Sequence, residues 1–316
     1  MTRPAPDPSR PNTPRPDTPR SSASRPGDPG AAPPAAASTV PDPFDRCALA
    51  RNRARAERIA RDGADFLVRL AVDDLVERLD GVERRFERAT LLDPPHPYAA
   101  ERVAASTRVA ALETVRTEPG GRVPLEPESV DLAVSAMALH VAADIPGALA
   151  QIARALKPDG LFLAVLPGGD TLRELREAWL AAESETAGGA GPRVHPTVDV
   201  RDAGALLQRA GFALPVADVD RLTVRYDSML SLAAELRAMG MGNALADRSR
   251  RPTRRDTLMR AAVLYGERFG DPDGRVRATF DLVSLSGWRP HSSQQKPLAP
   301  GSGAVSLADV LGGSGE

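Results

Sequence analysis

The sequence contains little cysteine, little lysine and few aromatic residues, and each shortage restricts what the protein can be. Its one cysteine, Cys47, excludes an intramolecular disulfide and any zinc site built from cysteines. Aromatic residues make up 4% of the chain, so the core must consist mostly of leucine, valine and alanine. Lys157 and Lys296 are the only lysines, and the resulting excess of arginine indicates a GC-rich genome rather than a function.

The sequence also lacks a long apolar run, an excess of charge and a metal-binding motif. No apolar run approaches the length of a transmembrane helix, and no signal-peptide core follows Met1. The net charge of −1 argues against a nucleic-acid partner and against general binding to membrane surfaces. The four histidines are scattered along the chain, so we expect no metal. Together these absences predict a cytoplasmic protein.

The composition changes along the chain and divides it into segments. Residues 1–43 are dominated by proline, serine, alanine and arginine, and such a segment buries too little apolar surface to offset its chain entropy. We therefore expect a disordered tail (1–43), a helical N-terminal cover (44–88), an α/β core (89–225), a helical cap insertion (226–275), a last core strand (276–290) and an irregular C-terminal tail (291–316).

The middle of the chain has the pattern of a strand, a helix and a second strand. Residues 130–136 are typical of a buried strand, and residues 146–156 have helical spacing. The sequence Lys157-Pro158-Asp159-Gly160 predicts a turn, and the apolar run from Phe162 predicts the second strand. This order is a βαβ crossover, the unit of a parallel sheet.

The second strand should end at Pro167-Gly168-Gly169, before another helix that Asp170 or Thr171 caps. In parallel sheets, ligands bind at the carboxyl ends of the strands. His140 and the segment Gly168–Thr171 lie at two such ends, so they are candidates for a functional site.

Three stretches carry a resemblance to a known family. The stretch VDLAVSAMALHVAADIPGALAQIARALKPDG is similar to the fourth and fifth strands of class I S-adenosylmethionine (SAM) methyltransferases. The stretches LPGGDTLRELREAWLAAE and RVHPTVDVRDAGALLQRAGFALPVADVDRLTVRY, with the GW…H-x-S-Q-x-x-P segment near the C-terminus, are more specific. They resemble bacterial relatives of mitochondrial complex I assembly factor 5, a methyltransferase-fold arginine hydroxylase family close to malonyl-carrier-protein methyltransferase.

The resemblance implies a fold, a cofactor and a set of site residues. The fold is a Rossmann-like α/β sheet with a helical cap insertion, and the helical cover would lie over the cofactor cleft. The implied cofactor is SAM, and the implied partner is a protein client, in this family a complex I subunit. Residues at the cofactor would be Asp93, Glu113, Glu118, Ser135, Met137 and His140, and residues at the substrate or partner would be Gly168, Gly169, Asp170, Arg254 and Arg255.

The sequence departs from the family where the cofactor should bind. A glycine-rich loop is expected after the first strand, but the chain has Pro94-Pro95-His96-Pro97, and proline removes N–H donors and fixes φ. Only 37 residues separate Asp93 from Asp131, which is too few for three crossover elements. We expect one βα unit near the cofactor site to be missing and SAM to bind weakly.

Two classes of function therefore remain open. The protein could be an enzyme that uses SAM to modify a protein subunit during complex I assembly, or a methyltransferase of small molecules or carrier proteins. Alternatively, it could be a non-catalytic assembly chaperone with a degenerate SAM site. The catalytic residues, the client and the oligomeric state are not predicted by the sequence.

Overall fold

The computed structural model describes residues 41–59 and 63–295, all within one unit of the chain, Ser38–Glu316. Of the segment predicted to be disordered, residues 1–40 lie outside this range, as do residues 296–316 of the predicted tail. Among the helices that are described, none is long and apolar enough to cross a membrane.

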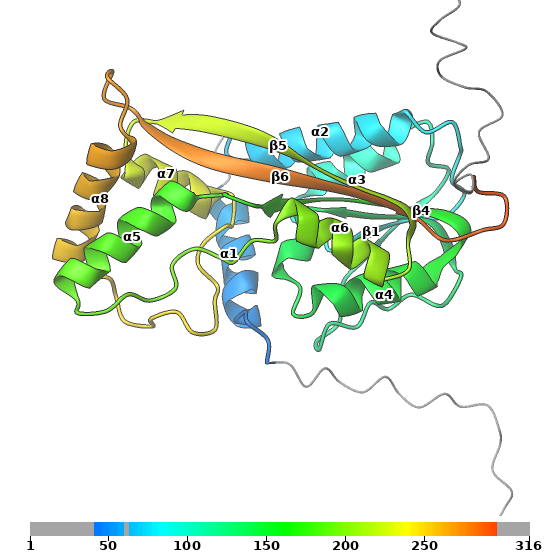
Figure 1. Cartoon of the computed structure of the whole chain (residues 1–316), viewed down its shortest axis with the longest axis horizontal. Helices are drawn as coiled ribbons and strands as arrows, with labels where there is room; N and C mark the ends of the chain where they lie inside the picture. Colours follow the sequence, from blue (N-terminus) through cyan, green and yellow to red (C-terminus); the bar gives the residue numbers. More distant parts are fainter. Residues whose placement is uncertain (1–40, 60–62, 296–316) are drawn as a thin grey trace, which may run out of the picture. The chain divides into compact units, whose positions relative to one another are not determined.

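A six-stranded sheet with the order β2-β1-β3-β4-β6-β5 forms the centre of the fold (Figure 1). Strands β1 to β4 run parallel to one another, whereas β6 is antiparallel to both β4 and β5. The strand order reverses between β1 and β3, which is the switch point where ligands bind in open α/β sheets. The strands are β1 (Ala89–Leu92), β2 (Leu112–Val115), β3 (Val130–Ala136), β4 (Leu156–Gly168), β5 (Ala213–Tyr226) and β6 (Val276–Trp288).

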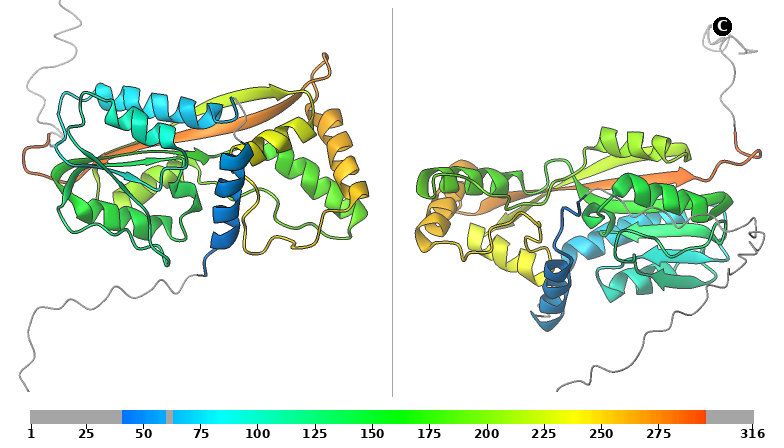
Figure 2. Two further views of the ribbon diagram at one scale, coloured as in Figure 1. Left: turned by 180° about the vertical axis from the view of Figure 1, so that it is seen from behind. Right: turned by 90° about the horizontal axis from the view of Figure 1, so that it is seen from below.

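Helices cover both faces of the sheet and create two apolar cores (Figure 2). Successive strand residues point to opposite faces, so Leu132 and Val134 of β3 join one core while Ala133 joins the other. The first core contains helices α2 (Phe66–Asp80) and α3 (Pro97–Ala104), and the second contains α4 (Ile145–Ala155) and α6 (Val200–Arg209). The fold is the Rossmann-like α/β architecture that the sequence predicted.

The predicted crossover is present, with one correction at its turn. Strand β3 has the predicted bounds, and α4 is displaced by one residue. The Lys157–Gly160 segment does not precede the second strand but lies inside β4, because Leu156 already pairs with Val130. Pairing resumes between Leu132 and Leu161, so the three extra residues form a bulge in which Asp159 has φ of +62°.

The N-terminal cover consists of two helices rather than one continuous helix. Helix α1 (Arg46–Ile59) is separated from α2 by a turn in which Gly63 has φ of +74°. A left-handed residue cannot continue an α-helix, which explains the break. The sequence analysis did not identify this break, because the apolar residues at helical spacing lie only after Gly63, in α2.

Between β1 and β3 the chain forms one helix, α3, and one strand, β2. Residues 116–129 return to β3 without a helix, and Val123 packs onto the second core. This arrangement confirms the missing βα unit predicted from the short spacing between Asp93 and Asp131.

A cap of helices lies beside the far end of the long β5 and β6 strands (Figure 1). Helices α7 (Met229–Ala238) and α8 (Arg255–Phe269) lie between β5 and β6 in the chain, where the insertion was predicted. Helix α5 (Arg173–Thr186) packs against α8, and α1 packs against α7. The cap therefore contacts both the core and the N-terminal cover.

Candidate functional site

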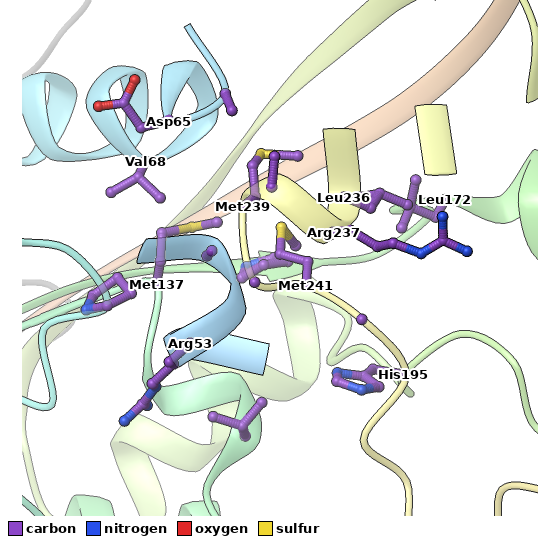
Figure 3. A pocket seen from close by; sticks show the side chains of 18 of the residues that line it. Arg53, Asp65, Val68, Met137, Leu172, His195, Leu236, Arg237, Met239 and Met241 are labelled. Atoms are coloured by element: carbon purple, nitrogen blue, oxygen red, sulfur yellow. The ribbon is translucent and has the colours of Figure 1, made fainter. Parts of the chain in front are cut away.

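A cavity of about 910 Å³ opens at the switch point of the sheet. This volume is at the upper end of the range for small-molecule pockets. Its walls come from α1, the loop after β1, the end of β3, the start of α5 and the segment after α7 (Figure 3). Arg53 and Met137 lie on one side of the cavity, and Leu172, Leu236 and Arg237 lie on the other. The core, the cover and the cap thus share one cavity.

His140 lines this cavity from a short 3₁₀ turn, Leu139–Val141, directly after β3. Its Nδ1 atom is buried and has no hydrogen-bond partner among the described residues. Burial, together with the nearby His195 and Arg53, lowers the pKa of His140 to about 3. The ring is therefore neutral at physiological pH, with one polar atom left for a ligand or a water molecule.

His195 lines the same cavity from the irregular segment before α6. Its Nε2 atom accepts a hydrogen bond of 3.1 Å from the backbone N–H of Ala244, so the proton of the neutral ring is on Nδ1. Its ring packs edge-on against Phe44 at 5.0 Å. Burial lowers the pKa of His195 to about 4. This histidine therefore joins three distant segments at the wall of the cavity.

The charged groups of the cavity are mostly arginines. Arg193 is held by Glu183 and lies over the ring of Trp179, with 4.7 Å between the guanidinium carbon and the ring centre. Arg53 and Arg237 have no ion-pair partner within the described part of the chain. On the acidic side, Asp65 pairs with Arg69 at 2.6 Å, and Glu57 is exposed. The cavity therefore favours anionic groups.

The proline-rich loop after β1 forms part of the wall. Pro95, His96 and Pro97 line the cavity, and Pro97 is the first residue of α3. The Nδ1 atom of His96 accepts a hydrogen bond of 3.2 Å from the N–H of Tyr98, which caps the helix. This contact occupies one of the few N–H donors that the loop retains, so little backbone remains to bind a ligand.

Two of the six predicted cofactor residues, Met137 and His140, line the cavity. Asp93 has φ of +47° and turns its carboxylate to Thr117, whose N–H donates to it at 3.1 Å. Ser135 is buried within β3, away from the cavity wall. The other two predicted cofactor residues, Glu113 on β2 and Glu118, are exposed and do not line the cavity. The Glu118 carboxylate lies 3.7 Å from the guanidinium of Arg122.

The predicted glycine turn lies at the edge of the cavity and is held by β6. Gly169 has φ of +47°, and Asp281 accepts a hydrogen bond of 2.8 Å from the N–H of Asp170. Asp170 also pairs with Arg221 at 2.7 Å. The prediction that Asp170 or Thr171 caps α5 is wrong, because the cap position is Leu172. The hydroxyl of Thr171 instead binds backbone groups of β4 and β6.

The two predicted arginines of the cap are at the surface. Arg254 is 69% exposed and pairs with Asp256 at 2.5 Å, and Arg255 is exposed at the start of α8. Neither lines the cavity, so a role for them would concern a partner surface.

Sequence reasoning missed Arg53 and the cap residues Met239 and Met241, which line the cavity. Arg53 was concealed because α1 contains many other arginines at exposed positions. The sequence Met239-Gly240-Met241-Gly242 contained a signal, since two glycines that interrupt a helical segment often allow a close approach of another chain segment.

No group of three His, Cys, Asp or Glu side chains within 41–59 and 63–295 is placed to hold a metal ion.

Comparison with known proteins adds a family context. Residues 77–164 match the family described as "Methyltransferase domain". The zebrafish protein described as "Arginine-hydroxylase NDUFAF5, mitochondrial" is 42% identical over 188 residues, which are 60% of this chain and 58% of that protein. The human protein of the same description is 40% identical over 54% of its length. The chain thus spans little more than half of these relatives.

A longer match covers most of both chains. The "Malonyl-[acyl-carrier protein] O-methyltransferase" of Halorhodospira halophila is 30% identical over 289 residues, which are 84% of this chain and 94% of that protein. Among solved structures, the YcgJ protein of Bacillus subtilis is 14% identical, with a TM-score of 0.47 over 69% of this chain and 99% of that one.

Proposed function

Since the chain belongs to the class I SAM-dependent methyltransferase family, we propose that it binds SAM at the switch point and acts in respiratory complex I assembly. In this role it modifies or holds a protein subunit. The relatives described as arginine hydroxylases, at 40–42% identity, support the assembly role. A cytoplasmic location is part of this proposal, although those relatives are described as mitochondrial.

The observation that carries the proposal is the buried Nδ1 atom of His140 at the cavity wall. A buried polar atom without a partner costs free energy, on the order of 1–3 kcal/mol, unless something in the cavity binds it. The cavity of about 910 Å³ has room for a nucleoside cofactor and for a substrate group. The residues present thus fit SAM in size and polarity, whereas the proline loop lacks donors for its amino-acid end.

Bound SAM would supply an electrophilic methyl group. The chain's own contribution would be to align the acceptor and exclude water, since alignment alone can provide much of the rate. Burial keeps the ring of His140 neutral, so one of its two ring nitrogens is unprotonated and can accept a proton from an acceptor group. Met239 and Met241 provide an adaptable apolar wall on the cap side.

A second candidate function is a non-catalytic chaperone, which the loop Pro94–Pro97 favours. Three prolines there remove three backbone donors from the segment that should hold the cofactor. A third candidate is O-methylation of a carrier-protein substrate. The long match to the Halorhodospira protein favours it, since that match includes the cap as well as the core.

The assembly role can be tested by deleting the gene and assaying the NADH:quinone activity of the membranes. We expect the activity to fall and to be restored by the wild-type gene. Full activity in the deletion strain would overturn the assembly role.

Complementation with His140→Gln separates the enzyme from the chaperone. Failure to restore activity, with normal protein levels, would support catalysis, and full restoration would support the chaperone. Calorimetry with SAM tests the cofactor separately, and an absence of binding at millimolar SAM would overturn that part of the proposal.

A further inference from the structure

The cofactor's amino-acid end carries a carboxylate, and the loop after β1 is poorly equipped to bind it. Proline has no N–H, so Pro94, Pro95 and Pro97 donate no hydrogen bonds. The N-terminus of α3 is already capped by His96. If SAM binds here, another group at the same end of the cavity must bind the carboxylate.

Arg53 of α1 is placed at that end. It lines the cavity on the same side as Met137, which directly follows β3 (Figure 3). The charges nearest to it come from both sides of the switch point, since Asp93 follows β1 and Arg116 follows β2. Arg53 therefore lies close to the carboxyl ends of the strands, although α1 is outside the α/β core.

The electrostatic surroundings of Arg53 compensate its charge only in part. Burial lowers the pKa of this guanidinium, and Arg116 and Arg46 lower it further, whereas Asp93 acts in the opposite direction. No carboxylate of the described residues comes within 4.0 Å of it, since Asp93 is turned toward Thr117. A half-buried cation in this position is stabilised by a bound anion.

Helix α1 is docked so that Arg53 lines the cavity. The neighbouring residue, Asn52, is buried, and its Nδ2 atom donates a hydrogen bond of 2.9 Å to the carbonyl of Gly242. A Cβ atom on Gly242 would lie 3.1 Å from Asn52, so glycine allows this close approach. At the start of the helix, Asp45 pairs with Arg248 at 2.8 Å. Both anchors hold α1 to the segment after α7.

We propose that Arg53 binds the carboxylate of the cofactor's amino-acid end and so replaces the N–H donors that the proline loop lacks. This inference rests on the proposed binding of SAM. The other cavity arginines are less suited, because Arg69 is paired with Asp65, Arg193 is held by Glu183 and Thr253, and Arg237 lies on the cap side. Helix α1 then becomes part of the cofactor site rather than a cover over it.

The test compares two ligands that differ in the amino-acid end, which carries the carboxylate. S-adenosylhomocysteine contains the amino-acid end, and 5′-methylthioadenosine retains the nucleoside and sulfur but lacks it. Their affinities are measured by equilibrium dialysis up to millimolar concentration, for wild type, Arg53→Ala and Arg55→Ala. Arg55 is the matched control, because it lies on α1 and is exposed outside the cavity. Thermal unfolding of each variant confirms that it is folded.

Arg53→Ala should weaken S-adenosylhomocysteine at least tenfold, as expected for a lost charge-assisted hydrogen bond, and leave 5′-methylthioadenosine within twofold. Arg55→Ala should change neither. The inference is overturned if Arg53→Ala changes neither ligand, or weakens both equally. If wild type binds neither ligand, the SAM proposal itself fails, which is a different result from binding that ignores Arg53.

Discussion

Gly168 and Gly169 lie where β4 ends and two other segments press against the backbone. A Cβ atom on Gly168 would lie 2.4 Å from Cγ2 of Val283 and 2.8 Å from the carbonyl of Val198. On Gly169 it would lie 2.5 Å from a carboxylate oxygen of Asp281, at a residue with φ of +47°. Both positions therefore require glycine for space, and Gly169 also for its backbone conformation.

We predict that Gly168→Ala and Gly169→Ala each lower the free energy of unfolding by about 1–3 kcal/mol, as overpacking does elsewhere. Urea denaturation measures this change. The matched control is Gly189→Ala, because nothing lies within 4 Å of a Cβ atom there. Wild-type stability in both test variants would show that the turn can rearrange without cost.

The two cavity histidines should make stability depend on pH. Their pKa values, about 3 for His140 and about 4 for His195, are below the ordinary value of 6.5 because both rings are buried. Between these values and 6.5 the unfolded chain binds more protons than the folded chain. Stability is therefore fully present above pH 6.5 and is lost as the pH falls, by up to about 1.4 kcal/mol per pH unit for each ring.

Urea denaturation between pH 7 and pH 5 measures how the free energy of unfolding changes with pH. The double variant His140→Gln/His195→Gln should show a smaller change. Glutamine at residue 195 can still accept the hydrogen bond from Ala244, so the packing of that segment is retained. An equal slope in the double variant would place the proton uptake on other groups.

At the scale of single residues, the sequence predicted which residues lie at strand ends better than it predicted which residues line the cavity. His140, Met137 and the glycine pair lie at strand ends, as the order of strands required, because strand ends follow from local apolar runs. Glu113 was expected at the cofactor, yet it is exposed on the edge strand and does not line the cavity. Because one βα unit is missing, β2 is the edge strand of the sheet. The spacing of residues in the sequence could not show which way the Glu113 carboxylate on this strand points.

At the scale of elements, a buried amide is one of the two anchors that hold helix α1. The hydrogen bond from Asn52 to Gly242 joins residues 190 positions apart in the sequence. We predict that Asn52→Ala lowers the unfolding free energy by about 1–3 kcal/mol, because it leaves the Gly242 carbonyl with one partner fewer. Hydrogen exchange of the α1 amides should quicken, since the helix is held by few contacts.

A control for the α1 prediction is Arg51→Ala, which changes an exposed residue on the same helix. It should leave both hydrogen exchange and stability near wild type. If Asn52→Ala behaves like this control, α1 is held mainly by its Asp45–Arg248 ion pair and its apolar contacts.

The strands and helices of the core were predictable because each is specified by a local pattern. Strand β3 has the predicted bounds, and β6 begins at the predicted residue, Val276, and ends two residues earlier than predicted. The bulge in β4 and the break before α2 were not predictable. Both depend on pairing or packing with distant segments. The local conformational preferences of Lys157–Gly160 and of Gly63 therefore could not predict them.

At the scale of the whole molecule, three parts of the chain close around one cavity. The core contributes the strand ends, the cover contributes Arg53, and the cap contributes the methionines and Arg237. The missing βα unit would otherwise contribute residues to one side of the cofactor site. Helix α1 and the segment after α7, which lie outside the sheet, line other sides of the cavity. Binding energy at this site should therefore be distributed over all three parts rather than concentrated in the loop after β1.

This distribution predicts weak binding of SAM and its product, with a dissociation constant of about 100 μM or higher, because Arg53 replaces only part of a glycine loop. At 1 mM S-adenosylhomocysteine such a site stabilises the fold by at most about 1.4 kcal/mol, since the gain is RT ln(1 + [L]/Kd). For a domain of this size, the melting temperature should rise by no more than about 6 °C. A micromolar site would instead add about 4 kcal/mol and raise it well beyond 8 °C. A thermal shift of that size, or SAM retained through purification, would show that the prolines do not weaken the site.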